Sequence, residues 1–486
     1  MALSMKRNRV LSLLFKKVKC RHALYRSIQH SVIQANEAGK TEDLYPPIKP
    51  KYPPGKWGSM DTKMAWILHE EGNKWKNTPT VKERLRYLET MYSEHGRKLW
   101  RYRALPDMPG LSAYQQDTTK TAIIPDAPEI LKTIDIDIES EFKEIKNIFI
   151  EKLAEEHELI ANQPLYLSKM QEDKVKLLNS KLIQSLVMTV VTALAQKHEH
   201  LMTGLVDPEV DISAFWERYG VRAFKPAPNK DKPFRLAIRF LQNYSSFQSE
   251  SQITCQLRSK NPLPEFLPRD HKICTSEPYP QCRFWPAEMG AMTDWVKPKC
   301  DPGYVAKDPF QFVNLSFVVR NYWGHTLVQK KLGDENLPEL LKYFGMNTAF
   351  ISAVAQAYNQ GFSTFVELTY PLTTQTVMTD GRQFSIYSYQ LNTLHLWKDD
   401  EANPLRNICF LQEFTLFDTI ENGKVKGFND EAFKALMRCF VLKPVDRGYD
   451  LRPSIPKDSP DNQREHIPMF KEEIVVKKEI VYDEGD

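Results

Sequence analysis

Residues 97–103 of this chain read RKLWRYR and place four cations beside two aromatic rings. Cationic side chains can neutralise phosphates, and the rings can stack on unpaired bases or on sugars. The candidate RNA-binding residues are Arg97, Lys98, Trp100, Arg101, Tyr102 and Arg103. We predict that they end a helix over residues 81–102. The competing interpretation is a solvated helix face, with Leu99 and Trp100 turned towards a core.

Two acidic residues, Glu367 and Asp380, are the candidates for hydrolytic chemistry. A pair of carboxylates can hold Mg²⁺ and activate a water, as in metal-dependent nucleases. Such sites usually also use a lysine, and Arg382 is a poor substitute because a guanidinium does not release its proton. Asp380 has a second explanation, since Asp380-Gly381 is a strong hairpin-turn signal. We therefore predict that Asp380 and Gly381 form a structural turn.

The possible metal ligands are His271, Cys274, Cys282 and Cys300. Structural zinc sites usually bring cysteines in close pairs, whereas here gaps of 7 and 17 residues separate the three thiols. We expect no metal site and no cofactor. The chain also lacks a glycine-rich dinucleotide fingerprint, a phosphate-binding loop and a Gly-x-Ser-x-Gly elbow, so we predict no catalytic residue.

The first 36 residues contain no Asp or Glu, and Glu37 is the first acid. Basic residues combined with apolar residues at helical spacing are the composition of a mitochondrial presequence. The alternative is a basic arm that binds nucleic acid or a membrane surface directly. Residues 1–103 hold 22 Lys and Arg against 9 Asp and Glu, whereas the rest of the chain carries a net charge of −9. A basic end on a mildly acidic body favours docking of that end onto a polyanion.

Apolar periodicity predicts an α+β fold: a helical N-terminal region, a mixed or antiparallel sheet domain with a packed helix, and a disordered C-terminal tail. Residues 137–160 and 174–197 should form two helices that pack antiparallel. Residues 337–360 should form an amphipathic helix that Gly361 caps and that covers one side of the sheet. Asn429 is placed to cap the last helix.

Strand signals surround the Asp380-Gly381 turn. Residues 375–379 and 383–396 should pair as its two arms, with alternate side chains divided between a core and an outer face. The other expected strands are residues 234–240, 252–257, 364–370 and 407–411. No apolar run reaches the roughly 20 residues that a membrane span requires. The nearest candidate, Leu182–Gln196, has 15 residues.

These signals divide the chain into four parts. We expect a presequence at residues 1–36, a basic extension with RNA-contacting helices at 37–130, a core at 131–443 and a charged tail at 444–486. The seven cysteines are too few for a disulfide scaffold and suit a reducing interior such as the mitochondrial matrix.

The stretch of residues 355–433 contains four long motifs. They read AQAYNQGF, QTVMTDGRQFSIYSYQLNTLHL, NPLRNIC and DTIENGKVKGFND. This stretch closely resembles the animal mitochondrial ribosomal protein family first catalogued as small-subunit protein thirty. That family is also called programmed cell death protein nine and is now assigned to the large subunit.

The resemblance implies a non-catalytic component of the large mitochondrial ribosomal subunit that contacts ribosomal RNA and other large-subunit proteins. One implied neighbour is a related protein, large-subunit protein thirty-seven, with a similar Thr-Asp-Gly hairpin followed by Gln-Leu-Asn-Thr. The alternative function is a mitochondrial matrix nuclease, or a nuclease-derived enzyme, that uses Glu367 and Asp380. Sedimentation separates the two hypotheses, because a ribosomal protein travels with its subunit.

Overall fold

The structure of the protein is a computed structural model. It describes residues 97–101, 110–140, 142–161, 169–220, 244–282, 286, 291–305, 308–320, 334–364 and 366–451. The chain divides into two compact units, Met1–Met60 and Asp61–Asp486, and every described residue belongs to the second. The expected presequence, the expected strand at residues 234–240 and most of the expected charged tail lie outside the described residues.

One mixed sheet organises the part of the chain that the structure describes. Its strand order is β2-β9-β8-β7-β6-β4-β1-β5, and β3 pairs with β4 outside this path. The strand bounds are β1 Arg97–Arg101, β2 Thr121–Ile124, β3 Leu205–Tyr219, β4 Tyr244–Ser259, β5 Met292–Val296, β6 Phe312–Val319, β7 Leu372–Thr379, β8 Gln383–Leu391 and β9 Asn407–Thr415. A separate hairpin joins β10 Thr419–Glu421 to β11 Lys424–Lys426. The mixed sheet and its separate helices confirm the α+β prediction.

The long strand β4 has three partners in this sheet. One of its edges pairs with β3 along nearly its whole length. The other edge is shared, because β1 pairs in parallel with Phe247 and Gln248 while β6 pairs with residues 255–259. β5 then pairs with the free side of β1. An early strand is therefore built into the sheet between β4 and the terminal strand β5.

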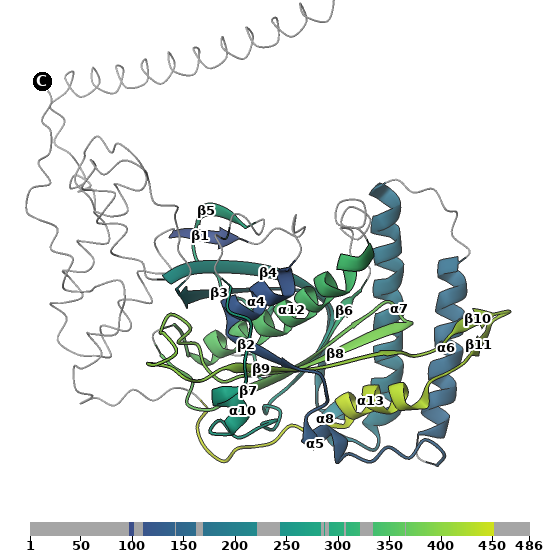
Figure 1. The fold of residues 1–486 in the computed structure, drawn as a ribbon. Coiled ribbons are helices and arrows are strands. Elements are labelled where there is room, and N and C mark those ends of the chain that lie inside the picture. The colour runs from purple at the N-terminus through teal and green to yellow at the C-terminus, as the bar shows by residue number, and fades with distance from the viewer. Residues whose placement is uncertain are drawn as a thin grey trace, which may run out of the picture. The chain divides into compact units, whose positions relative to one another are not determined.

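Helices cover both faces of the sheet (Figure 1). The helix bounds are α4 Leu111–Thr119, α5 Glu129–Lys132, α6 Lys143–Ala161, α7 Lys169–Ala195, α8 Glu199–Met202, α10 Lys272–Ser276, η2 Asp334–Asn336 (a 3-10 helix), α12 Leu337–Gln360 and α13 Asp430–Val441. α12 and α4 share one apolar core with the sheet, and α6, α7 and α13 share another. Figure 1 shows α6 and α7 side by side as the antiparallel pair that their apolar spacing predicts.

Strand β8 shows how the two cores are built. Phe384 and Ile386 enter the core beneath α6 and α7, whereas Tyr387 and Tyr389 enter the core beneath α12. This is the alternation expected of a strand. The prediction that one face of β8 is an outer face is wrong, because both faces are covered.

The helix-end predictions are confirmed. α12 has the predicted bounds, and Gly361 caps it in the left-handed conformation with φ 101°. The Asn429 side chain accepts hydrogen bonds from the N–H groups of Glu431 and Ala432, each at 3.1 Å. It therefore satisfies two of the otherwise unpaired donors at the start of α13.

Several segment predictions are wrong. Residues 97–101 form strand β1 instead of the end of a helix. Residues 366–370 lie outside any strand, and β7 begins only at Leu372. Strand β3 was not predicted at all. Its Asp, Glu and Pro residues interrupt the alternation of apolar residues that would indicate a strand.

The core also extends beyond the boundaries expected at residues 131 and 443. β2 joins the sheet by pairing with β9, so residues before 131 belong to the core. After α13, the Arg447 guanidinium lies 3.1 Å from the Glu265 carboxylate and stacks over the Tyr370 ring. This ion pair and ring contact hold the described residues of the expected tail against the core.

One stretch within α7, Leu177–Ala195, has the length and hydropathy of a membrane span. Its apolar side packs against α6 and the sheet, through Ile183, Leu186 and Val190 among others. The core helix of a soluble protein passes the same compositional test, so this stretch is weak support for membrane insertion.

Candidate functional site

Strand β1 carries the described part of the candidate RNA-binding segment. Leu99 is fully buried and Trp100 is 4% exposed. Neighbouring side chains of a strand point to opposite faces, so both faces of β1 are covered here. Burial makes the Trp100 ring unavailable for stacking on a base in this structure. The competing interpretation, with Leu99 and Trp100 in a core, is correct for these two side chains.

Arg101 is the cation of this segment whose side chain the structure describes. Its guanidinium lies 3.2 Å from the Glu250 carboxylate, and the two side chains are 40% and 58% exposed. The backbone of Arg97 and Lys98 pairs with β5. Tyr102 and Arg103 lie outside the described residues. Contact with RNA therefore stays a prediction that depends on the cations of the segment.

The Asp380-Gly381 turn forms at the predicted place, but it is longer than the two-residue turn that an Asp-Gly pair most often forms. Thr379 pairs with Phe384, so four residues lie between the paired positions instead of two. The Asp380 Oδ1 atom accepts hydrogen bonds from the N–H groups of Arg382 (2.9 Å) and Gln383 (2.7 Å). Within this turn, Gly381 is the one residue with positive φ, at 93°. The Asp380 carboxylate thus closes the turn through side-chain acceptance.

Glu367 lies in a loop before β7 and binds the loop after β8. It accepts hydrogen bonds from the Thr393 hydroxyl (2.6 Å) and from the N–H groups of Leu394 and Leu368 (each 2.8 Å). Burial raises the pKa of the Glu367 carboxyl, but the charge of His395 and these hydrogen bonds outweigh burial and leave the pKa below its ordinary value. The carboxylate is therefore engaged in holding two loops together.

Glu367 and Asp380 cannot share a metal ion in this fold. Strand β7 lies between them in the chain and has eight residues. At about 3.3 Å per residue, an eight-residue strand is about 26 Å long. Carboxylates that bind one ion lie within a few ångströms of each other. The nuclease hypothesis that pairs Glu367 with Asp380 is therefore wrong.

Two of the possible metal ligands have other hydrogen-bond partners. His271 Nδ1 accepts from Ile273 N–H (3.2 Å) at the start of α10. Cys300 Sγ accepts from Phe215 N–H (3.2 Å), and burial raises the pKa of this thiol to about 12. A thiol must lose its proton to bind zinc. Among the described residues, no three His, Cys, Asp or Glu side chains are grouped to hold a metal ion.

The end of β8 and the start of β9 form a polar clamp, which we define as Gln390, Asn392 and Asn407. Gln390 Oε1 accepts from the N–H of Phe266 (2.9 Å), and its Nε2 donates to Leu267 O (2.8 Å). Asn407 Oδ1 accepts from Asn392 N–H (2.8 Å). All three side chains are fully buried. Each of them satisfies backbone groups of loops that have no strand partner there.

A second buried polar group centres on Lys120, which sequence analysis missed. Its ammonium lies 2.8 Å from the Asp400 carboxylate and also donates to Asn403 O. Burial lowers the pKa of Lys120, while Asp400 opposes that effect. Nearby, Arg218 pairs with Asp117 at 3.3 Å. These ion pairs join the end of α4 to β3 and to the loop before β9. A lone lysine between threonines carries no sequence signal for such a role.

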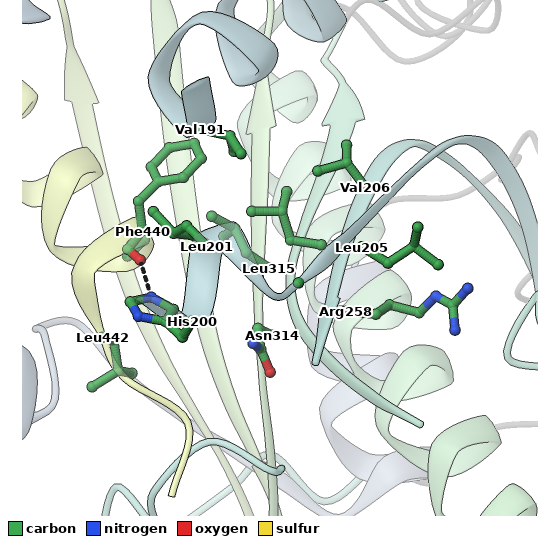
Figure 2. A pocket seen from close by; sticks show the side chains of 13 residues that line it. Val191, His200, Leu201, Leu205, Val206, Arg258, Asn314, Leu315, Phe440 and Leu442 are labelled. Carbon is green, nitrogen blue, oxygen red and sulfur yellow. Dashed lines mark hydrogen bonds between the residues drawn. The ribbon is translucent and has the colours of Figure 1, made fainter. Parts of the chain in front are cut away.

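One small cavity lies between α8, β6 and α13 (Figure 2). Figure 2 shows His200 pointing to Phe440, and His200 Nε2 lies 2.9 Å from Phe440 O. The cavity volume is about 20 Å³, which is room for about one water. It is too small to hold a substrate.

The described polar residues thus support packing, loop closure and turn formation, and the Arg101 side chain of the candidate binding segment is partly exposed beside β1. A sequence model of one protein family matches this chain over residues 11–444, and that family is described as mitochondrial 28S ribosomal protein S30 (PDCD9). The match covers the basic N-terminal region from residue 11 onward, the sheet and both buried polar groups. The chain therefore belongs to the mitochondrial ribosomal protein S30 (PDCD9) family.

Proposed function

We propose that this protein is a structural component of the large subunit of the mitochondrial ribosome. There it binds ribosomal RNA and neighbouring proteins, including the related large-subunit protein thirty-seven. Membership of a mitochondrial ribosomal protein family is the observation that carries the proposal. The engagement of Glu367 and Asp380 in loop and turn closure supports a non-catalytic role.

Assignment to the large subunit is a proposal, because the family description names the 28S particle. The test is sedimentation of the tagged protein from mitochondria under conditions that separate the subunits. We expect the protein to travel with the large subunit and its RNA. Migration with the small subunit contradicts the subunit assignment, and recovery at the top of the gradient contradicts the ribosomal role.

We assign the RNA contact to the basic N-terminal region, in which residues 1–103 carry a net charge of +13. Within it, the cations of the segment 97–103 neutralise phosphates, whereas Trp100 supports the core. Alanine replacement should therefore lower the salt dependence of RNA binding. The replaced residues are Arg97, Lys98, Arg101 and Arg103.

Binding of the full chain to ribosomal RNA over a range of salt concentrations measures this effect. The slope of log affinity against log salt should fall by roughly 0.7–0.9 per lost contact. A matched control removes four exposed lysines elsewhere, and these are Lys272, Lys297, Lys424 and Lys443. Equal slopes for the two variants would show that the segment is merely solvated.

We place the protein in the mitochondrial matrix, and we propose that import removes the first part of the chain. Cleavage between Ala23 and Asn36 would remove most of the acid-free stretch. N-terminal sequencing of the protein from purified matrix is the test. A matrix form that retains Met1 contradicts cleavage.

A further inference from the structure

Half of β9 has an open edge among the residues that the structure describes. β2 pairs with β9 only from Asn407 to Phe410, whereas β9 continues to Thr415. After Ile124 the chain turns away at Pro125, which has no N–H to donate. On the other side, β9 stays paired with β8 up to Thr415. Open strand edges are templates for pairing with another chain.

The backbone groups at this edge have a defined register. The N–H of Asn407 donates to Lys120 O (2.9 Å) on the β2 side. Backbone groups alternate in direction along a strand, so Leu411 and Glu413 direct theirs to the same side. The edge from Leu411 to Thr415 spans about 17 Å. This length suits an added strand of about five residues.

A groove of about 910 Å³ runs beside this edge. Its walls are the start of α12 with η2, helix α4 and the end of β2. Figure 1 shows α4 and α12 near one another in the same region of the fold as β2 and β9. Ile123 and Leu411 supply apolar surface in this groove. An extended peptide can therefore pair with β9 and place alternate side chains against these walls.

The groove is acidic. Its lining includes four carboxylates and one ammonium, which belong to Asp126, Glu335, Glu339, Glu413 and Lys342. Lys132, beside the lining, pairs with Asp126 at 2.6 Å, so the lining and this neighbour together carry a formal charge of −2. Lys342 lies 3.7 Å from Glu413, a loose pair in which both side chains are about 40% exposed. Such a pair is weak in water and leaves Glu413 accessible to a second cation. A negative groove repels nucleic-acid phosphates and attracts lysine and arginine.

We propose that this groove binds an extended, lysine- and arginine-rich segment of a neighbouring protein, which adds to β9 as a strand. The backbone of the segment pairs with the open edge, and its alternate cationic side chains face the carboxylates. The identity of the neighbour as a ribosomal protein rests on the proposed function, but the recognition chemistry does not.

Binding of a defined peptide to the purified full chain tests the recognition chemistry. The probe is a fluorescein-labelled octapeptide that alternates lysine with threonine or valine, read by anisotropy. One matched probe carries glutamate at each lysine position, and another carries N-methyl groups on alternate backbone amides. We expect the lysine probe alone to bind tightly. Equal binding of the glutamate probe contradicts the charge argument, and equal binding of the N-methyl probe contradicts strand addition.

Charge-reversal variants locate the site. Glu413→Lys should weaken lysine-probe binding roughly tenfold or more, because like charges then face each other. Glu335→Lys makes the same change at a second exposed residue of the groove wall and should also weaken binding. Because Glu335 lies in η2, this loss would not come from misfolding of β9. Glu401→Lys makes the same change on an exposed loop outside the groove and should bind like the wild type. Equal loss in all three variants contradicts the proposed location.

A photo-crosslinking amino acid at position 413 in assembled subunits tests the occupant. We expect a crosslink to a lysine- and arginine-rich segment of another ribosomal protein, and none of this kind from position 401. A crosslink to ribosomal RNA, or to this chain itself, contradicts the proposal. If the protein sediments outside the ribosome but the peptide results hold, the ribosomal proposal fails while the groove chemistry stands.

Discussion

The β7–β8 hairpin and strand β1 lie in one sheet, but they differ in how far along the chain their pairing partners lie. In the hairpin, the turn residues and both arms lie within 20 residues of chain. In β1, the partners of Trp100 are Phe247 in β4 and Thr293 in β5. Local chemistry therefore identifies the hairpin, whereas the role of β1 depends on distant strands. A basic and aromatic segment can thus resemble a binding helix and still be a core strand.

The largest effect should come from Trp100→Ala. A buried tryptophan replaced by alanine typically costs about 3–5 kcal/mol of unfolding free energy. Denaturant unfolding of the full chain measures this loss. The control, Arg101→Ala, removes an exposed ion pair and should change stability by less than about 1 kcal/mol. Unchanged stability of Trp100→Ala with weakened RNA binding would restore the base-stacking interpretation.

Gly381→Val should be the next most damaging change. A Cβ atom at this position would lie 2.6 Å from Leu182 Cδ2 in α7, and the backbone has φ +93°. Strain and overpacking together should cost about 3 kcal/mol, measured as a shift in the unfolding midpoint. Gly423→Val separates these causes, because Gly423 has φ +70° but no atom within 4 Å of the added Cβ. If both variants lose the same stability, contact with α7 is not part of the hairpin's role.

Glu367→Gln should have a smaller, pH-dependent effect. The pKa of Glu367 is lower in the folded protein than its ordinary value of 4.5. Its charged form therefore stabilises the fold fully above about pH 4.5, and this contribution disappears as pH falls through the folded pKa. At pH 7 the variant should lose about 1–2 kcal/mol, because an amide keeps only one acceptor oxygen.

Unfolding free energies of wild type and Glu367→Gln, measured between pH 3 and 7, should converge as pH falls. A difference that stays constant with pH would mean that the charge of Glu367 contributes nothing and that only its shape matters.

The smallest effect should come from Asp380→Asn. An amide oxygen can accept the same two hydrogen bonds from Arg382 and Gln383, so stability should change by less than about 0.5 kcal/mol. Incorporation into the large subunit should also be unchanged. A stable variant that fails to assemble would show that the Asp380 charge has a function beyond the turn.

The same contrast of distances explains what sequence analysis predicts and what it misses. The α12 helix, the Gly361 cap and the Asn429 cap depend on neighbours within a few residues, and all three are confirmed. The burial of Lys120 depends on Asp400, which lies 280 residues later. The clamp residue Gln390 meets Phe266 and Leu267 across more than 120 residues.

Within the candidate binding segment, the RNA-binding role of the cations stays a prediction, whereas the predicted helix is wrong for residues 97–101. Alternation over RKLWR is too short to distinguish a strand from a helix end. Pairing with β4 and β5 makes this segment a strand. The residues near β1 in the sequence do not indicate that pairing.

The pairing of β2 with β9 sets an order for folding. Lys120 O accepts from the N–H of Asn407, so an early segment can take its final place only after most of the chain is available. Contacts this distant are slow to form, because a long loop must close first. A chain that emerges from its N-terminus must therefore keep this part of the sheet incomplete until its last third has arrived. A chain truncated before β9 leaves β2 without the strand that it pairs with. The sheet is therefore completed only when the C-terminal strand β9 is present.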